Sequence, residues 1–423
     1  MSGPRRDSSA PPPYVSTNTP AIHRYPVSTG AQKQWGLLTL TSVARSTRST
    51  PLYYEGDSVQ GALEVDLADR TSPIKAITVS VSGSVITGPM VGDTATFLRL
   101  STCLWSRKSS AARVGRCTWP FSIPLPRAAT IARRGQSATC PLPETFMERH
   151  TRVAVVYEVA VTIARGMLRT DTTFKRRFRY VPRTAPPPPS ALRQLAYAQN
   201  TTLSGPRDDP DGWHTPATVM AHGQVFRTRQ AVVQCTFSLA SPLSYPRGAA
   251  IPCWLVLESG DPHALDAFAD PSALNVRLRR RVRWKATPGM HRGAGDAPCA
   301  LADAASAVWW PAPVHDAAPH TRTLEGEIRL PPTLTASAHM GAAQFSISYT
   351  VDLFPPVCVG FTPTGAGPLL SIPVDIVTMH ADAPRPLVYA PPAYTCGPLE
   401  LDRGEEVMRV DLATRMMGTM RIC

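Results

Sequence analysis

The sequence has very little lysine, no long apolar run and no apolar stretch at its start. Only five of its 44 basic residues are lysine, so 39 are arginine, and the formal net charge is +13. No segment reaches the roughly 18 uninterrupted apolar residues of a membrane-spanning helix, and the first residues lack the apolar core of a secretory signal. These absences predict a cytosolic protein, and the charge favours anionic partners such as phosphorylated tails or acidic lipid headgroups.

Closely spaced cysteines and short catalytic motifs are also lacking. The nine cysteines are odd in number and scattered, which predicts free thiols. The sequence has no Cys/His metal-ligand spacing, no serine-hydrolase elbow, no phosphate loop, no dinucleotide-binding turn and no nucleic-acid-binding signature. We therefore expect a protein that is not an enzyme, uses no metal or cofactor and does not bind nucleic acid.

Short β-like segments fill most of the chain, and helical periodicity is scarce. The clearest segment has one apolar face made of Val153, Val155, Tyr157, Val159, Val161 and Ile163. A spacing of two is typical of a half-buried strand. Such runs are separated by Gly, Pro and Asp, as in an all-β sandwich.

A run of four prolines divides these segments into two blocks. It lies in RTAPPPPSALRQ, residues 183–194, and is expected to form a stiff, extended segment. The sequence predicts five parts, which are a disordered tail over 1–33, a β-sandwich over 34–182, a proline-rich linker over 183–215, a second β-sandwich over 216–380, and a tail over 381–423.

Both blocks carry stretches that occur in a familiar order. They are LYYEGDSVQGALEVDL, IKAITVSVSGSV, WPFSIPLP and VVYEVAVTIAR, followed by CTFSLASPLSYPRGAAIPCWLVLES and FSISYTVDLF. Together they resemble the arrestin-like family, specifically its alpha-arrestin branch of trafficking adaptors, over roughly residues 35 to 380. The resemblance implies two immunoglobulin-like β-sandwich lobes, the arrestin fold, joined by a proline-rich hinge. It also implies that the strand after Gly56 and Asp57 pairs with the ITVSVSG strand. A sandwich of another lineage is the alternative.

A Pro-Pro-x-Tyr motif stands near each end of the chain, in the two predicted tails. The residues that a WW domain would read are Pro11, Pro12 and Tyr14, and Pro391, Pro392 and Tyr394. Paired prolines favour the extended left-handed helix before binding, so little entropy is lost in an aromatic groove. A random chain of this composition would contain about 0.1 copies. Two copies would also permit bivalent capture by a protein with several WW domains.

Arginine recurs at every second position of NVRLRRRVRW. One face of this predicted strand carries Arg277, Arg279, Arg281 and Arg283. The row has two interpretations, which are the solvated face of an edge strand protected by charge or a face that binds phosphates or acidic tails through bidentate guanidinium contacts. FKRRFRY, residues 174–180, repeats the pattern and is equally ambiguous.

These features, with the resemblance, predict a non-catalytic adaptor at the plasma membrane or endosomes. Its lobes would bind the cytosolic tails of membrane-protein cargo, with acidic lipid headgroups as further partners, and its motifs would recruit a HECT-type ubiquitin ligase through WW domains. If the ligase modifies its own adaptor, the candidate acceptors are Lys33, Lys75, Lys108, Lys175 and Lys285. The alternatives are a sorting-coat scaffold of the same fold, similar to the small retromer subunit, and a secreted adhesion or carbohydrate-binding sandwich.

Overall fold

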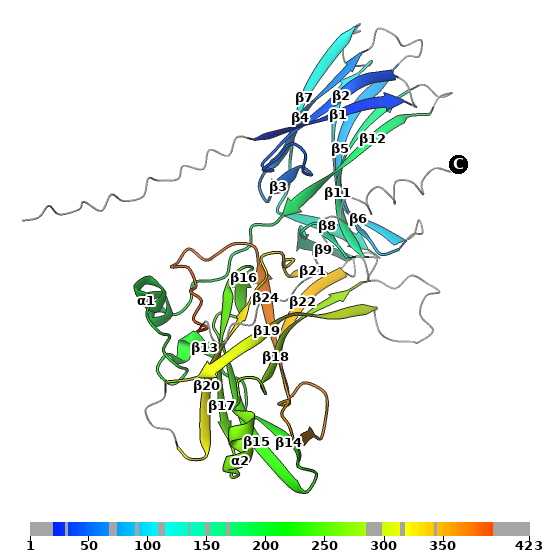
Figure 1. The fold of residues 1–423 in the computed structure, drawn as a ribbon. Coiled ribbons are helices and arrows are strands. Elements are labelled where there is room, and N and C mark those ends of the chain that lie inside the picture. Colours follow the sequence, from blue (N-terminus) through cyan, green and yellow to red (C-terminus); the bar gives the residue numbers. More distant parts are fainter. Residues whose placement is uncertain are drawn as a thin grey trace, which may run out of the picture. The chain divides into compact units, whose positions relative to one another are not determined.

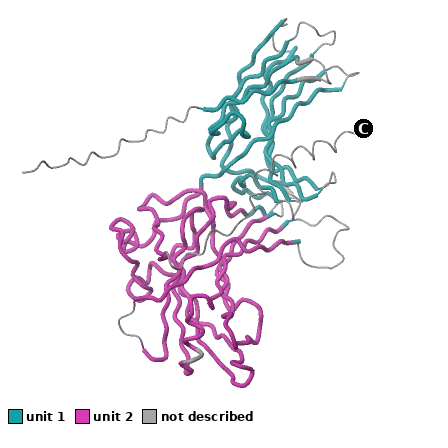
Figure 2. The backbone as a smooth tube through the Cα atoms, in the orientation of Figure 1, with its two compact units in different colours: residues 1–183, 284–298, 339–345 teal, residues 184–283, 299–338, 346–423 magenta. Residues whose placement is uncertain are grey.

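The computed structural model is mostly β, with 58% strand and 6% helix, which confirms the predicted all-β class. It describes residues 20–29, 33–66, 74–88, 93–108, 115–133, 136–148, 153–165, 170–284, 298–313, 318–341 and 345–391. The chain forms two compact units (Figure 2). Unit 1 comprises Met1–Arg183, Trp284–Pro298 and His339–Phe345, and unit 2 comprises Thr184–Arg283, Cys299–Ala338 and Ser346–Cys423. Among the described residues, no helix is both long and apolar enough to cross a bilayer.

Unit 1 is built from two main sheets and a small hairpin (Figure 1). The first sheet has the order β1-β2-β4-β7, with β1 (Ala21–Thr29), β2 (Lys33–Ser42), β4 (Ser58–Asp66) and β7 (Arg116–Pro124). The second has the order β3-β12-β11-β5-β6, with β3 (Leu52–Tyr54), β12 (Thr172–Val181), β11 (Ala154–Ala164), β5 (Ala76–Ile86) and β6 (Thr94–Ser106). In addition, β10 (Phe146–Met147) pairs with β11, and β8 (Ala128–Arg133) pairs with β9 (Gln136–Pro141).

The predicted half-buried strand is β11, and its apolar face is part of the core. Val153, Val155, Tyr157, Val159, Val161 and Ile163 are all at most 1% exposed. Tyr157 packs against Phe178 and Tyr180 of β12 at ring-centroid distances of 5.6 and 5.1 Å. Its hydroxyl donates a hydrogen bond to the carbonyl of Pro143 at 2.7 Å. The alternation read from the sequence therefore places the buried face correctly.

Two expectations for unit 1 are wrong. Residues 21–29, assigned to a disordered tail, form strand β1, in which His23 and Val27 are buried. Pro26 is tolerated because β1 is an edge strand. The strand after Gly56 and Asp57, which is β4, pairs with β2 and β7 and not with the ITVSVSG strand β5, which lies in the other sheet.

Unit 2 is built around one long, curled sheet. Its order is β16-β24-β22-β18-β19-β20-β17-β15-β14-β23. The strands are β13 (Trp213–His214), β14 (Val219–Val225), β15 (Arg229–Ala240), β16 (Ser244–Pro246), β17 (Ala250–Glu258), β18 (Asn275–Arg283), β19 (Cys299–Pro311), β20 (Thr321–Arg329), β22 (Phe345–Phe354), β23 (Phe361–Pro363) and β24 (Leu370–Val377), and β21 (Ala338–Met340) is a short strand at the unit boundary.

The curl of this sheet creates the core of unit 2. Residues 299–306 of β19 pair with β18, and residues 307–311 pair with β20, so one strand belongs to both halves of the sheet. Trp309 of β19 is 1% exposed and meets Phe237 of β15 at a ring-centroid distance of 6.2 Å. That contact lies within the half that runs from β19 to β15. A small cavity lined by Val233 and Cys235 of β15 and by Leu353 of β22 shows the apolar sides of the two halves facing each other, as in a sandwich.

The segment predicted to be an extended linker contains a helix. Residues 182–190 are neither helix nor strand, but α1 spans Ala191–Gln199. The side chain of Ser190 accepts a hydrogen bond from the Arg193 amide, and Asn200 ends the helix in the left-handed conformation. A short 3-10 helix (Pro210–Gly212) follows α1, and α2 (Pro262–Phe268) follows β17. The proline run thus leads directly into helix α1 of unit 2.

Candidate functional site

The predicted arginine row lies on β18, and the structure places this strand inside the sheet. β18 pairs with β19 on one side and with β22 on the other. Val276, Leu278 and Val282 are buried on its opposite face. The alternation is as predicted, but the edge-strand interpretation is wrong because both sides of β18 are hydrogen bonded. Charge on this strand therefore does not serve to protect an open edge.

The first half of the row is paired with two aspartates. Arg277 Nη1 lies 2.7 Å from Asp303 Oδ2, and Arg279 Nε lies 3.2 Å from Asp303 Oδ1. Arg279 also reaches Asp352 of β22, with 3.4 Å between Nη1 and Oδ2. Asp352 is only 4% exposed, so its carboxylate depends on this partner.

An aromatic ring holds the same two guanidinium groups. Arg277 and Arg279 lie over Phe354 of β22, at 5.6 and 5.5 Å from the ring centroid. Arg277 Nε also donates to Asn275 Oδ1 at 2.8 Å. Stacking and ion pairing restrain both side chains, so this half of the row joins three strands to one another rather than presenting free cations to a ligand.

The second half of the row has different neighbours on β22. Arg281 lies opposite Ser348, and Arg283 lies opposite Ser346, both on β22. Among the described residues, neither guanidinium has an acidic partner, and Arg283 is exposed. Two arginines next to two serine hydroxyls could bind a carboxylate or a phosphate through charge-assisted hydrogen bonds. This pair is the candidate site for an anionic partner.

The second basic segment, FKRRFRY, forms β12 and divides its charges between two faces. Arg176 points into unit 1, where its guanidinium lies over Phe174 and over Tyr25 of β1 at 4.1 and 5.2 Å. Burial lowers the pKa of Arg176, and the nearby Tyr25 opposes this effect. Arg176 of β12 therefore connects the two sheets of unit 1 through its contact with Tyr25 of β1.

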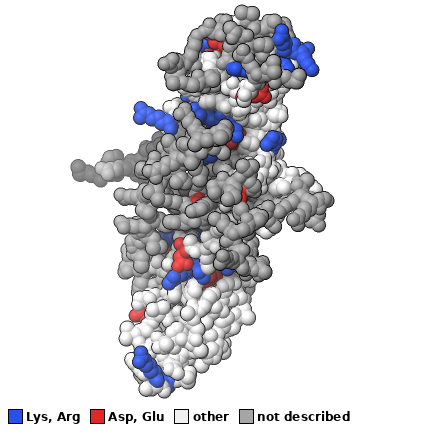
Figure 3. All heavy atoms as spheres, turned by 90° about the vertical axis from the view of Figure 1, so that its right-hand side faces the viewer, with Lys and Arg blue, Asp and Glu red and all other residues white. Residues whose placement is uncertain are grey.

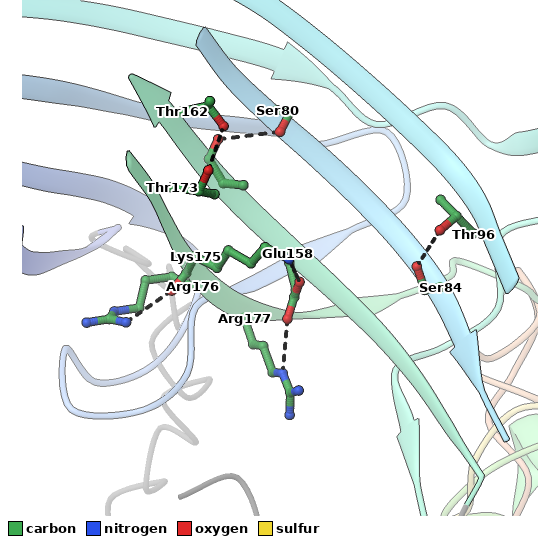
Figure 4. Close-up of polar contacts among 10 residues, drawn as sticks. Ser80, Ser84, Thr96, Glu158, Thr162, Thr173, Lys175, Arg176 and Arg177 are labelled. Atoms are coloured by element: carbon green, nitrogen blue, oxygen red, sulfur yellow. Dashed lines mark hydrogen bonds and ion pairs between the residues drawn. The ribbon is translucent and has the colours of Figure 1, made fainter. Parts of the chain in front are cut away.

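Two of the other three cations of β12 share one carboxylate on the outer face (Figure 4), and the third, Arg179, is exposed. Lys175 Nζ and Arg177 Nε lie 3.7 and 3.3 Å from Glu158 of β11. The same face carries hydroxyl pairs, with Ser84 and Thr96 at 3.1 Å. This face is polar, and Lys175 and Arg177 are paired with Glu158, unlike Arg281 and Arg283.

The described basic side chains are spread over the face drawn in Figure 3. They form small separate groups, of which some lie beside acidic side chains and others, such as those at the upper right and at the bottom, do not. Within the described part of the chain, no cluster of His, Cys, Asp and Glu could hold a metal ion.

The remaining predicted residues are only partly described. Pro11, Pro12, Tyr14, Pro392 and Tyr394 lie outside the described residues, and Pro391 is the last residue described. Lys75, Lys108 and Lys175 are exposed, whereas Lys285 and the side chain of Lys33 lie outside the description.

Sequence reasoning missed the acidic partners of the arginine row and one buried arginine. Asp303 and Asp352 are far from β18 in the chain, and only strand register brings them to Arg277 and Arg279. Arg193 of α1 is 3% exposed and was not considered, although arginine on a short helix after a proline run is a visible signal.

Comparison with known proteins adds no assignment. A scan against protein-family models gave no match, and a search of curated proteins gave none. The class that the fold defines is therefore an all-β protein of two compact units, and the functional conclusion depends on its own residues.

Proposed function

We propose that this protein is a non-catalytic adaptor that resembles alpha-arrestins. In this proposal, two immunoglobulin-like sandwich lobes, joined at the proline-rich segment, bind the cytosolic tails of membrane proteins. The motifs at Tyr14 and Tyr394 recruit a HECT-type ubiquitin ligase through its WW domains, in the cytoplasm at the plasma membrane or endosomes.

The observation that supports the proposal is the sequence position of the two Pro-Pro-x-Tyr motifs, one before the first described strand and one after the last. Unit 1 begins with β1 at Ala21, after the first motif, and the last described strand of unit 2 ends at Val377, before the second. The pair Arg281 and Arg283 supports an acidic cargo tail as the second partner.

Binding to WW domains tests the proposal. We expect the full chain to bind tandem WW domains of HECT-type ligases, and Tyr14→Ala or Tyr394→Ala alone to weaken binding about 10-fold to 100-fold through loss of the second contact. The double variant should lose measurable binding. Tyr389→Ala, a tyrosine near the second motif but outside it, is the matched control and should bind like the wild type.

A chain that binds none of these WW domains would overturn the recruitment step. Binding to coat subunits that survives both tyrosine substitutions would instead support the sorting-coat scaffold.

A further inference from the structure

Unit 2 contains a small cavity between α1 and the segment that follows its last described strand. Its volume is about 50 Å³. It is lined mainly by proline and tyrosine, including Pro187, Pro242, Tyr197 and Tyr245, and by His380. Burial lowers the pKa of His380, and the charge of Arg385 lowers it further, so His380 is neutral near pH 7. Arg193 is therefore the one charged group among the lining residues.

Arg193 is buried and lacks most of its hydrogen bonds. The residue is 3% exposed, and its Nη1 donates to the carbonyl of Ser241 at 2.9 Å. Nε and Nη2 have no hydrogen-bond partner among the described residues. The guanidinium lies over Trp213, 4.7 Å from the ring centroid, which orients its plane. Nε and Nη2, the two nitrogens without a partner, lie on the same side of the planar guanidinium group.

No carboxylate of the described chain compensates this cation by direct contact. The nearest acidic influence comes from Asp209, whose oxygens are already used by the Ser190 hydroxyl at 2.6 Å and the Gly212 amide at 3.1 Å. Burial lowers the pKa of Arg193, but a guanidinium stays protonated at neutral pH. A buried charge without a partner is strongly unfavourable, which is why such groups are normally paired.

We propose that this cavity binds a carboxylate, whose two oxygens accept hydrogen bonds from Nε and Nη2 of Arg193. The side-on, bidentate pairing of arginine with a carboxylate matches the two open donors. It also neutralises the buried charge without disturbing the bond from Nη1 to Ser241.

The chemistry of the cavity favours a carboxylate over a phosphate. A phosphate dianion needs more donors than one guanidinium edge supplies, and the prolines of the lining have no amide hydrogen. The volume of about 50 Å³ admits a small planar group. Tyr389 lies beside the site, with its ring 6.4 Å from that of Tyr197, and its hydroxyl also has no partner among the described residues.

The carboxylate can have two sources. One is a separate ligand or peptide, and the other is this chain, whose last 24 residues include Glu400, Asp402, Glu405, Glu406 and Asp411. Both sources offer the same chemistry, and the experiment must separate them.

The test uses the full chain with acetate as the probe, added in place of chloride at constant ionic strength. We expect acetate to raise the midpoint of thermal unfolding of the wild type in a saturable manner, and to give a saturation-transfer NMR signal. Arg193→Met should abolish both effects. Arg207→Met, which removes an exposed arginine of the same unit, should respond like the wild type.

A second full-length variant distinguishes the sources, with all five of those acidic residues changed to their amides. If acetate binds to this variant but not to the wild type, the chain's own carboxylate occupies the site. If acetate binds neither, the proposal is overturned. If inorganic phosphate raises the midpoint of thermal unfolding as much as acetate does, or more, the assignment to a carboxylate is overturned. Because the NMR signal is measured on folded wild type, the test does not depend on whether Arg193→Met folds.

Discussion

Gly326 illustrates how closely the core of unit 2 is packed at a single residue. A Cβ atom at this position would lie 2.5 Å from Cε3 of Trp309, on the neighbouring strand β19. Trp309 is 1% exposed and cannot easily move away. The glycine is therefore required by the close approach of the indole ring.

We expect Gly326→Ala to lower the free energy of unfolding by about 2 kcal/mol, because the added methyl group overpacks the core. Chemical denaturation measures this change. Gly260→Ala is the matched control, since nothing lies within 4 Å of a Cβ there, and it should change stability by less than about 0.5 kcal/mol. Equal effects of the two substitutions would contradict the packing argument.

The cysteines differ in reactivity because they differ in burial. Burial raises the pKa of Cys235 to about 12, whereas Cys103 and Cys299 are exposed. We expect iodoacetamide at pH 8 to modify Cys103 and Cys299 in the folded protein and Cys235 only after unfolding, because the thiolate is the nucleophile. Mass spectrometry of digested protein identifies the modified sites. Rapid modification of Cys235 in the folded state would contradict its burial.

The same pKa shift predicts a loss of stability in alkali. The folded state holds the Cys235 proton more tightly than the unfolded state, whose thiol has a pKa of about 9. The stabilisation is complete below pH 9 and is lost as the pH rises from 9 towards 12. Cys235→Ala should therefore reduce the slope of stability against pH in this range, as measured by denaturant unfolding.

At the scale of the element, β18 has two different halves. Arg277 and Arg279 tie β18 to Asp303 and Asp352. The two strands beside Arg281 and Arg283 offer no carboxylate opposite them, only serines on β22 and Leu301 and Cys299 on β19. One run of alternating arginines thus combines a structural ion-pair network with a candidate ligand site. The difference arises from the neighbouring strands and not from β18.

Removing one arginine from each half should change the free energy of unfolding by very different amounts. Arg279→Met leaves the buried carboxylate of Asp352 without its cation, so we expect a loss of about 3 kcal/mol in the free energy of unfolding. Arg283→Met removes an exposed charge without an acidic partner and should change stability by less than about 0.5 kcal/mol. Similar losses for both variants would contradict the division of the strand.

The elements also show what local patterns predict. The spacing of two in β11 and in β18 predicted the buried faces of both strands, because side chains of a strand alternate between its two sides. The helix α1 was missed because the proline run before it dominated the interpretation, although Ser190 is a good helix-capping residue. Strand β1 was missed because its Ser, Thr and Pro residues are typical of loops.

At the scale of the whole molecule, the shortage of lysine restricts where ubiquitin can be attached. Of the five lysines, Lys75, Lys108 and Lys175 are exposed on unit 1. In the proposed function, we expect a chain with all five changed to arginine to carry no ubiquitin in a reconstituted reaction with a WW-domain ligase. Binding to that ligase should be unchanged, which distinguishes a lost acceptor from a lost contact. Ubiquitin on internal residues of this variant would contradict the prediction.

The sequence by itself determined the all-β class, the strand faces and the excess of arginine, because these depend on composition and on neighbours two residues apart. Only the tertiary structure decided which strands pair. Asp303 is 26 residues from Arg277, and Asp352 is 73 residues from Arg279, so no local pattern could link them. The same limit explains why β4 and β5 were assigned to one sheet, and why the unpartnered edge of Arg193 could not be seen. Pairing and burial depend on contacts between distant segments, and those contacts form only when the chain folds.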